Sequence, residues 1–186
     1  YQGRMTREVA HKTGQLIVVE GYMDVISLAE AGINNAVAPL GTALTEGQIR
    51  ELWKFSAEPI ICFDGDSAGV RAAVRASDRL LPILEPGFSA RFASLTPGED
   101  PDDIVRRGGA NKFRELLETS IGLSEFFWET EKSTGSLDTP EKQAAFFKRI
   151  RKRVGEIRNQ NVREAYKDLV EAKIGSFRAS MRMDKN

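Results

Sequence analysis

The chain has 186 residues, enough for one ordinary domain or for one domain with a small annex. Its composition, 41% hydrophobic and 29% charged, is that of a globular protein that buries a core without needing disulfides. Cys62 is the only cysteine, which excludes a disulfide framework and a cysteine zinc site, and we expect a buried thiol there. No apolar segment approaches the roughly 20 residues of a membrane span, so we expect a cytoplasmic protein. Because the chain starts at Tyr1 rather than at a methionine, we expect it to be a piece of a longer protein.

The formal charges balance at 27 Lys and Arg against 27 Asp and Glu, but they are unevenly distributed. Residues 1–140 hold 14 basic and 21 acidic side chains, whereas residues 141–186 hold 13 and 6. A basic tail of this kind is compatible with a nucleic-acid partner, although a basic helix face is more often simply solvated.

Short apolar runs alternate with helix-like segments along the first 107 residues. Strands are predicted at residues 15–20, 36–40, 60–63 and 90–95, and helices at residues 22–31, after Thr45, at 68–84 and at about 101–107. Thr45 and Gln48 have the spacing of a capping box, which predicts the start of the second helix. Strands that alternate with helices favour βαβ units. We therefore predict an α/β fold with a parallel sheet of about four strands flanked by helices.

Beyond about residue 110 the strand signal stops. Amphipathic helices are predicted at residues 111–119, 123–132, 140–154 and 161–181, and the polar stretch at 133–139 (STGSLDT) is the clearest linker. We therefore place an α/β domain at residues 1–122 and a small all-α helical subdomain at residues 123–186.

The stretch at residues 59–70, PIICFDGDSAGV, carries the clearest chemical signal. Asp64 and Asp66 stand at the carboxyl end of a buried strand, which is where open α/β sheets place ligands. Two hard oxygen ligands beside a glycine suit a divalent cation. Asp66 or Ser67 could instead cap the next helix, and this stretch alone does not decide between the two interpretations.

Acidic side chains follow three of the predicted strands. They are Glu20 and Asp24 after the first strand, Asp64 and Asp66 after the third, and Asp100, Asp102 and Asp103 after the fourth. Each has a structural alternative, because Asp24 and Asp102 could complement a helix amino end, Asp100 could be an N-cap, and Glu20 could be a rim acid. Three acidic sites on one sheet edge repel one another unless cations lie between them, which favours a divalent-metal site.

A divalent-metal site of this kind serves phosphoryl or nucleotidyl transfer, because the ion can activate an attacking hydroxyl and neutralise a leaving pyrophosphate. The sequence has no GxxxxGK[ST] loop and no HExxH motif, so it is neither a P-loop NTPase nor a zinc protease of that class.

Four motifs carry a family resemblance. VVEGYMDV (18–25), APLGTALT (38–45), CFDGDSAG (62–69) and PGEDPDD (97–103) resemble, in order and spacing, the Toprim domain of bacterial DnaG-type replicative primases. The helical tail resembles the small helical bundle that follows Toprim in those enzymes. The resemblance therefore covers nearly the whole chain and implies a Toprim-type sheet.

The resemblance implies roles for individual residues. Glu20, Asp64 and Asp66 match the catalytic acids that bind Mg²⁺ or Mn²⁺, and more than one ion is expected. Asp24, Asp100 and Asp102 match supporting acids that extend the metal site. Gly21, Gly41, Gly65 and Gly69 match motif glycines whose backbone passes close to the site. Whether Glu20 is a ligand or a proton-transfer group stays open.

The implied reaction is synthesis of short RNA primers on a single-stranded DNA template from NTPs. Primases of this type also have an amino-terminal zinc-binding domain, a basic amino-terminal part of the polymerase core and a carboxyl-terminal domain that contacts the replicative helicase. None of these fits in this chain, so zinc and helicase contacts are expected outside it. We expect the chain alone to bind metal, to bind DNA weakly and to synthesise little or no primer.

Other interpretations remain open. A Toprim nuclease or topoisomerase module is one, although none of Tyr1, Tyr22 and Tyr166 has a convincing setting for a topoisomerase nucleophile. An aspartyl-phosphate phosphatase is another, but Ala68 stands where that family has Thr or Val. The last is a module that binds replication partners and uses its metal only structurally.

Overall fold

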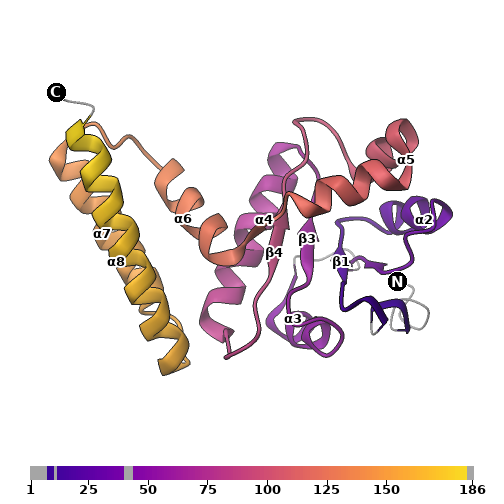
Figure 1. Cartoon of the computed structure of the whole chain (residues 1–186), viewed down its shortest axis with the longest axis horizontal. Helices are drawn as coiled ribbons and strands as arrows, with labels where there is room; N and C mark the ends of the chain where they lie inside the picture. Colours follow the sequence, from indigo (N-terminus) through magenta and orange to yellow (C-terminus); the bar gives the residue numbers. More distant parts are fainter. Residues whose placement is uncertain (1–7, 11, 40–43, 184–186) are drawn as a thin grey trace. The chain divides into compact units, whose positions relative to one another are not determined.

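The computed structural model describes residues 8–10, 12–39 and 44–183 (Figure 1). The chain forms two compact units. The first comprises Tyr1–Leu80 and Gly87–Leu123, and the second comprises Leu81–Pro86 and Ser124–Asn186. Residues 81–86, which the sequence analysis placed in the α/β domain, thus pack with the helical unit.

The first unit is built on a five-stranded sheet of order β2-β1-β3-β4-β5. The strands are β1 (Ile17–Val18), β2 (Ala36–Val37), β3 (Ile60–Cys62), β4 (Arg91–Ala93) and β5 (Ile121–Gly122). The first four are mutually parallel, as predicted, whereas β5 pairs antiparallel with β4. β5 was not predicted, because it has only two residues, one of them glycine, and so shows no apolar run.

Helices of this unit include α2 (Tyr22–Glu30), α3 (Glu46–Trp53), α4 (Ser67–Leu80) and α5 (Pro101–Glu118). The predicted capping box is present at α3, where Thr45 Oγ1 accepts the Gln48 N–H and Gln48 Oε1 accepts the Thr45 N–H. α5 bends at Gly109, which has φ 72° and ψ 179°. The two helices predicted around this point are therefore joined across a non-helical glycine.

The α-helix predicted at residues 68–84 ends earlier than expected. α4 stops at Leu80, and a 3-10 helix, η1 (Leu81–Ile83), follows. Pro82 has no N–H to donate to a preceding carbonyl, so it cannot continue the α-helix.

The core of the first unit lies on both faces of the parallel strands. Ile17, Val19, Ile60 and Cys62 are buried on one face with Phe113 of α5, and Val18 and Ile61, which alternate with them, are buried on the opposite face. The Cys62 thiol is fully buried, which confirms the expected buried cysteine, and desolvation raises its pKa to about 12. These apolar runs are buried because helices cover a parallel sheet on both faces.

The second unit is helical, with α6 (Leu123–Ser133), α7 (Pro140–Val154) and α8 (Gln160–Met183). α7 and α8 lie side by side (Figure 1). Its core is aromatic, with Trp128 and Phe146 edge to face at 5.2 Å and Phe147 and Phe177 at 6.1 Å between ring centroids. Within the described ranges, no helix combines the length and apolar character needed to cross a membrane.

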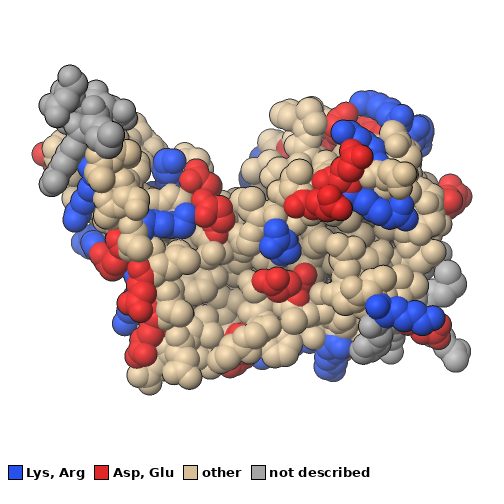
Figure 2. Space-filling view, in the orientation of Figure 1, with Lys and Arg blue, Asp and Glu red and all other residues tan. Residues whose placement is uncertain are grey.

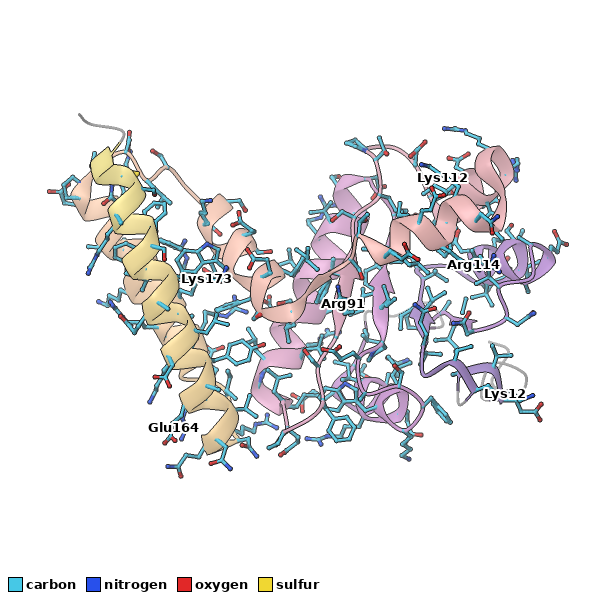
Figure 3. The ribbon with its side chains drawn as sticks, in the orientation of Figure 1. Lys12, Arg91, Lys112, Arg114, Glu164 and Lys173 are labelled. Carbon is cyan, nitrogen blue, oxygen red and sulfur yellow. The ribbon has the colours of Figure 1, made fainter. Side chains whose placement is uncertain are left out.

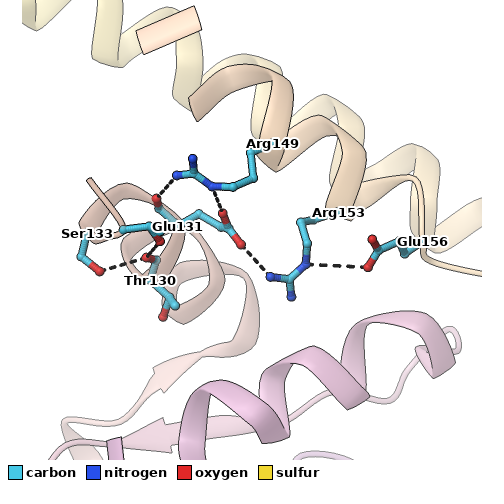
Figure 4. Close-up of polar contacts among 7 residues, drawn as sticks. Thr130, Glu131, Ser133, Arg149, Arg153 and Glu156 are labelled. Carbon is cyan, nitrogen blue, oxygen red and sulfur yellow. Dashed lines mark hydrogen bonds and ion pairs between the residues drawn. The ribbon is translucent and has the colours of Figure 1, made fainter. Parts of the chain in front are cut away.

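A buried carboxylate joins α6 to α7 (Figure 4). Glu131 is 4% exposed and accepts hydrogen bonds from Arg149 Nε at 2.7 Å and Arg153 Nη1 at 2.6 Å. Elsewhere in the unit Arg151 pairs with Glu171. Three arginines of the basic tail are therefore paired with acids of the same unit, which favours a structural role over a nucleic-acid surface for these three.

Candidate functional site

Carboxylates from three strand ends lie near one another in the first unit. We call this set the acidic edge; it comprises Glu20, Asp24, Asp64, Asp66, Asp100 and Asp102. β1 and β3 run parallel, as do β3 and β4, so the segments that leave these strands emerge at the same edge of the sheet. This proximity is reflected in the pKa of Asp64, because the negative charges of Asp24, Glu20, Asp100 and Asp66 all contribute to raising it.

Asp64 is the least satisfied member of the acidic edge. Its Oδ1 atom is buried and has no hydrogen-bond partner among the described residues. Burial, followed by the repulsion of the neighbouring carboxylates, raises the pKa of Asp64 to about 6. A buried oxygen without a donor costs free energy, and a bound cation would remove that cost.

Asp24 lies at the start of α2 and is 8% exposed. Its Oδ2 accepts the Gly21 N–H at 3.0 Å, which favours the charged form. Burial outweighs this hydrogen bond and raises the pKa of Asp24, and repulsion from Asp100, Asp102 and Glu20 adds to the rise. A Cβ at Gly21 would lie 3.1 Å from the same carboxylate oxygen, so the backbone is close to the side chain here.

The capping interpretations left open by the sequence hold for two of the acids. Asp66 Oδ1 accepts the N–H groups of Ala68 at 2.8 Å and Gly69 at 2.7 Å, at the start of α4. Asp100 is the N-cap of α5, where its Oδ1 accepts the Asp103 N–H at 2.7 Å. Each cap fixes a carboxylate through Oδ1, so capping is compatible with cation binding through the other oxygen.

Two motif glycines allow the backbone to pass beside Asp64. A Cβ at Gly65 would lie 2.1 Å from the Thr96 carbonyl oxygen, and a Cβ at Gly69 would lie 2.2 Å from the Asp64 carbonyl oxygen. Neither position has room for a side chain, which explains the glycines physically. Gly41, the remaining glycine of the expected set, lies outside the described residues.

Two arginines that the sequence analysis did not single out pair with acids of α5 and of the loop before it. Arg106 pairs with Asp102, and Arg107 pairs with Glu99 at 2.8 Å and Asp103 at 3.4 Å. The four-residue spacing of Asp102 and Arg106 could have indicated the first pair. The pair with Glu99 spans the start of the helix and has no such local signal.

The acidic edge fits a divalent cation in its chemistry. It offers hard oxygen donors, and the buried Oδ1 of Asp64 lacks a partner. Over the described ranges, no three acidic, cysteine or histidine side chains form a group that could hold one ion. The predicted acids thus lie close enough for their charges to interact, but no three of those described are placed to bind one ion together. Mg²⁺ takes few protein carboxylates and keeps several waters, so one or two of these oxygens suffice for it.

Comparison with known proteins gives matches to both units. A family model described as the Toprim domain matches residues 14–93, and one described as the DnaB-helicase binding domain of primase matches residues 124–176. The second match falls within this chain, whereas the family resemblance implied a helicase contact in a domain outside it.

Relatives and solved structures agree with these matches. The DNA primase of Rickettsia bellii is 40% identical over 157 residues, which are 84% of this chain and 26% of that protein. A crystal structure of a DNA primase domain from Pseudomonas aeruginosa has a TM-score of 0.86 and 36% identity, over 94% of this chain and 55% of that one. A DnaG primase catalytic domain bound to ssDNA has a TM-score of 0.82 and 34% identity, over 92% of this chain and 56% of that one.

These matches favour a primase over the other Toprim interpretations. The chain spans about a quarter of the length of the curated primases that it matches. By its Toprim segment, its helical segment and the structures it resembles, the chain matches a fragment of the bacterial DnaG-type DNA primases.

Proposed function

We propose that the acidic edge is the divalent-metal centre of a primase that synthesises short RNA primers on single-stranded DNA. In this reaction a ribonucleotide 3′-hydroxyl attacks the α-phosphate of an NTP and pyrophosphate leaves. The observation that carries the proposal is the buried, unpartnered Oδ1 of Asp64, whose pKa is raised to about 6 by burial and then by the neighbouring carboxylates.

Asp64 and Asp66 are the proposed ligands, with Glu20 as a third ligand or a proton-transfer group. A Mg²⁺ or Mn²⁺ ion bound there would lower the pKa of the attacking hydroxyl and neutralise charge on the leaving pyrophosphate. The helix cap at Asp66 holds its carboxylate in one orientation before any ligand arrives. Asp24, held by the Gly21 N–H, contributes negative charge from a buried position.

The substrates follow from the relatives. A structural neighbour is a DnaG primase catalytic domain bound to ssDNA, and we propose the same class of template for the protein that contains this chain. Because the chain spans about half of that catalytic domain, we expect the template contacts to be incomplete and the chain alone to make little primer.

The proposal is tested by titrating Mn²⁺ into the 186-residue chain and its Asp64→Asn variant, with isothermal titration calorimetry as the readout. The native chain should bind Mn²⁺ saturably, and the variant should bind it at least roughly tenfold more weakly, because the amide offers a neutral oxygen in place of a carboxylate. Asp138→Asn is the matched control, since Asp138 is a fully exposed acid of the helical unit. Equal Mn²⁺ affinity of all three proteins would refute the proposal.

We also propose that residues 124–176 contact a DnaB-type replicative helicase, because the helicase-binding family model matches this segment. Biolayer interferometry with immobilised chain and soluble helicase should show saturable binding. The Asp64→Asn variant should bind the helicase as tightly as the native chain, because Asp64 belongs to the other unit. Absence of saturable binding would refute this second proposal and leave the metal centre unaffected.

A further inference from the structure

Two exposed arginines of α5 face the acids at the start of that helix. Helical side chains tilt toward the amino end of the helix, so Arg106 and Arg107 reach back over the first turn. There Arg106 meets Asp102, and Arg107 meets Glu99 and Asp103. The arginine side chains are 73% and 64% exposed, whereas their carboxylate partners are 26–32% exposed. Figure 2 shows Lys and Arg beside Asp and Glu over α5.

The acids of this region fall into two groups. Asp24 and Asp64 lie among other carboxylates, and neither pairs with a Lys or Arg in the described part of the chain. By contrast, Glu99, Asp102 and Asp103 each have an arginine partner. Among the described residues, the inner acids (Asp24 and Asp64) thus lack a counter-ion, and the outer acids (Glu99, Asp102 and Asp103) have one.

The outer group is joined to the turn that carries Asp64. The Gly65 N–H donates to the Glu99 carbonyl oxygen at 2.9 Å, so the residue that pairs with Arg107 is anchored to the turn between Asp64 and Asp66. A ligand bound to Asp64 would therefore lie next to the segment that carries Glu99, the carboxylate partner of Arg107.

We propose that Arg106 and Arg107 bind phosphate oxygens of the incoming nucleoside triphosphate, exchanging their carboxylate partners for phosphate. This inference rests on the proposed function, because the inner acids then hold the cation that accompanies the triphosphate. Exposed Arg–carboxylate pairs contribute little to stability, so they exchange readily. A guanidinium presents parallel N–H donors that match a phosphate, and it brings positive charge that a triphosphate needs beyond its divalent ion.

The test compares the chain with its Arg106→Ala/Arg107→Ala variant by calorimetric titration, first with Mn²⁺ alone and then with Mg²⁺ and ATP. ATP affinity should fall by roughly tenfold or more, which corresponds to the loss of charge-assisted hydrogen bonds to phosphate. Mn²⁺ affinity should stay unchanged or rise, because the arginines compete with cations for the acids. The ATP affinity of an Arg106→Lys/Arg107→Lys variant should lie between those of the native chain and the double-alanine variant, since lysine keeps the positive charge but lacks the parallel N–H donors of a guanidinium.

Lys112→Ala/Arg114→Ala is the matched control. Both residues come from α5 (Figure 3), both are exposed, and their removal changes the net charge by the same amount. ATP affinity of the Arg106/Arg107 variants equal to that of this control would refute the inference and leave the metal centre intact. Parallel loss of Mn²⁺ and ATP affinity would also refute it, since the arginines would then act only by holding the acids in place. Failure of the native chain to bind Mn²⁺ would remove the proposed function and this inference together.

Discussion

Replacing Asp64 by Asn should make the metal-free chain more stable at pH 8. The folded chain holds the Asp64 proton up to a pKa of about 6, whereas an unfolded chain releases it near the ordinary value of 3.8. Above pH 6 the folded chain therefore carries a charge that its surroundings disfavour. The contribution of Asp64 to stability is fully present below about pH 4 and is lost as the pH rises through 6.

The size of the effect follows from the shift. About two pKa units correspond to about 3 kcal/mol. Because Asp64 is only half-buried, solvent screening reduces this to about 1 kcal/mol. The Asp64→Asn variant should thus be about 1 kcal/mol more stable than the native chain at pH 8, a rise of about 2–4 °C in melting temperature. At pH 4 the two proteins should be equally stable, because both then carry an uncharged group.

Urea unfolding at pH 4 and pH 8 measures this difference, with Trp128 replaced by Phe in each protein so that fluorescence of the buried Trp53 reports on the first unit. Saturating Mg²⁺ at pH 8 should stabilise the native chain and have a smaller effect on the Asp64→Asn variant. In Asp138 a hydrogen bond from Lys142 lowers the pKa to about 2, so Asp138→Asn should not stabilise the chain at pH 8. An Asp64→Asn variant that is less stable than the native chain at both pH values would refute the reasoning.

Three further substitutions or reactions test the packing. Gly65→Ala places a Cβ 2.1 Å from a backbone oxygen and should destabilise the first unit by about 1–3 kcal/mol in urea unfolding. In the control Gly47→Ala the new Cβ meets nothing closer than 4.0 Å, so this variant should be neutral or slightly stabilising. Equal effects of the two substitutions would contradict this. Glu131→Gln should destabilise the helical unit by about 1–2 kcal/mol, because two arginines lose a charged acceptor, and unchanged amide exchange in α6 would argue against it. The Cys62 thiol, with a pKa raised to about 12, should react with Ellman's reagent only on unfolding, and rapid labelling of the native chain would exclude the buried setting.

The parallel sheet could be predicted because its strands are short, almost purely apolar runs separated by helical periodicity. β5 could not, because its pairing with β4 is set by tertiary contacts of Ile121 and Gly122 and not by their own pattern. The early end of α4 was predictable in principle from Pro82, whose missing N–H forbids an α-helix there.

The acidic edge could be predicted as a set, because the carboxyl ends of parallel strands share one edge. The hydrogen-bond partners of each acid could not be predicted. Asp66 and Asp100 cap helices, whereas Asp64 keeps an unpartnered oxygen, and only the packed structure distinguishes them. The burial of Glu131 was also beyond sequence reasoning, since its arginine partners lie 18 and 22 residues away on another helix.

Anomalous diffraction from crystals soaked in Mn²⁺ tests the central claim most directly. The proposed metal centre predicts a Mn²⁺ peak within bonding distance of an Asp64 carboxylate oxygen, with further ligands from the acidic edge or from water. Mn²⁺ peaks elsewhere on the chain at saturating Mn²⁺, with none within bonding distance of Asp64, would contradict the claim.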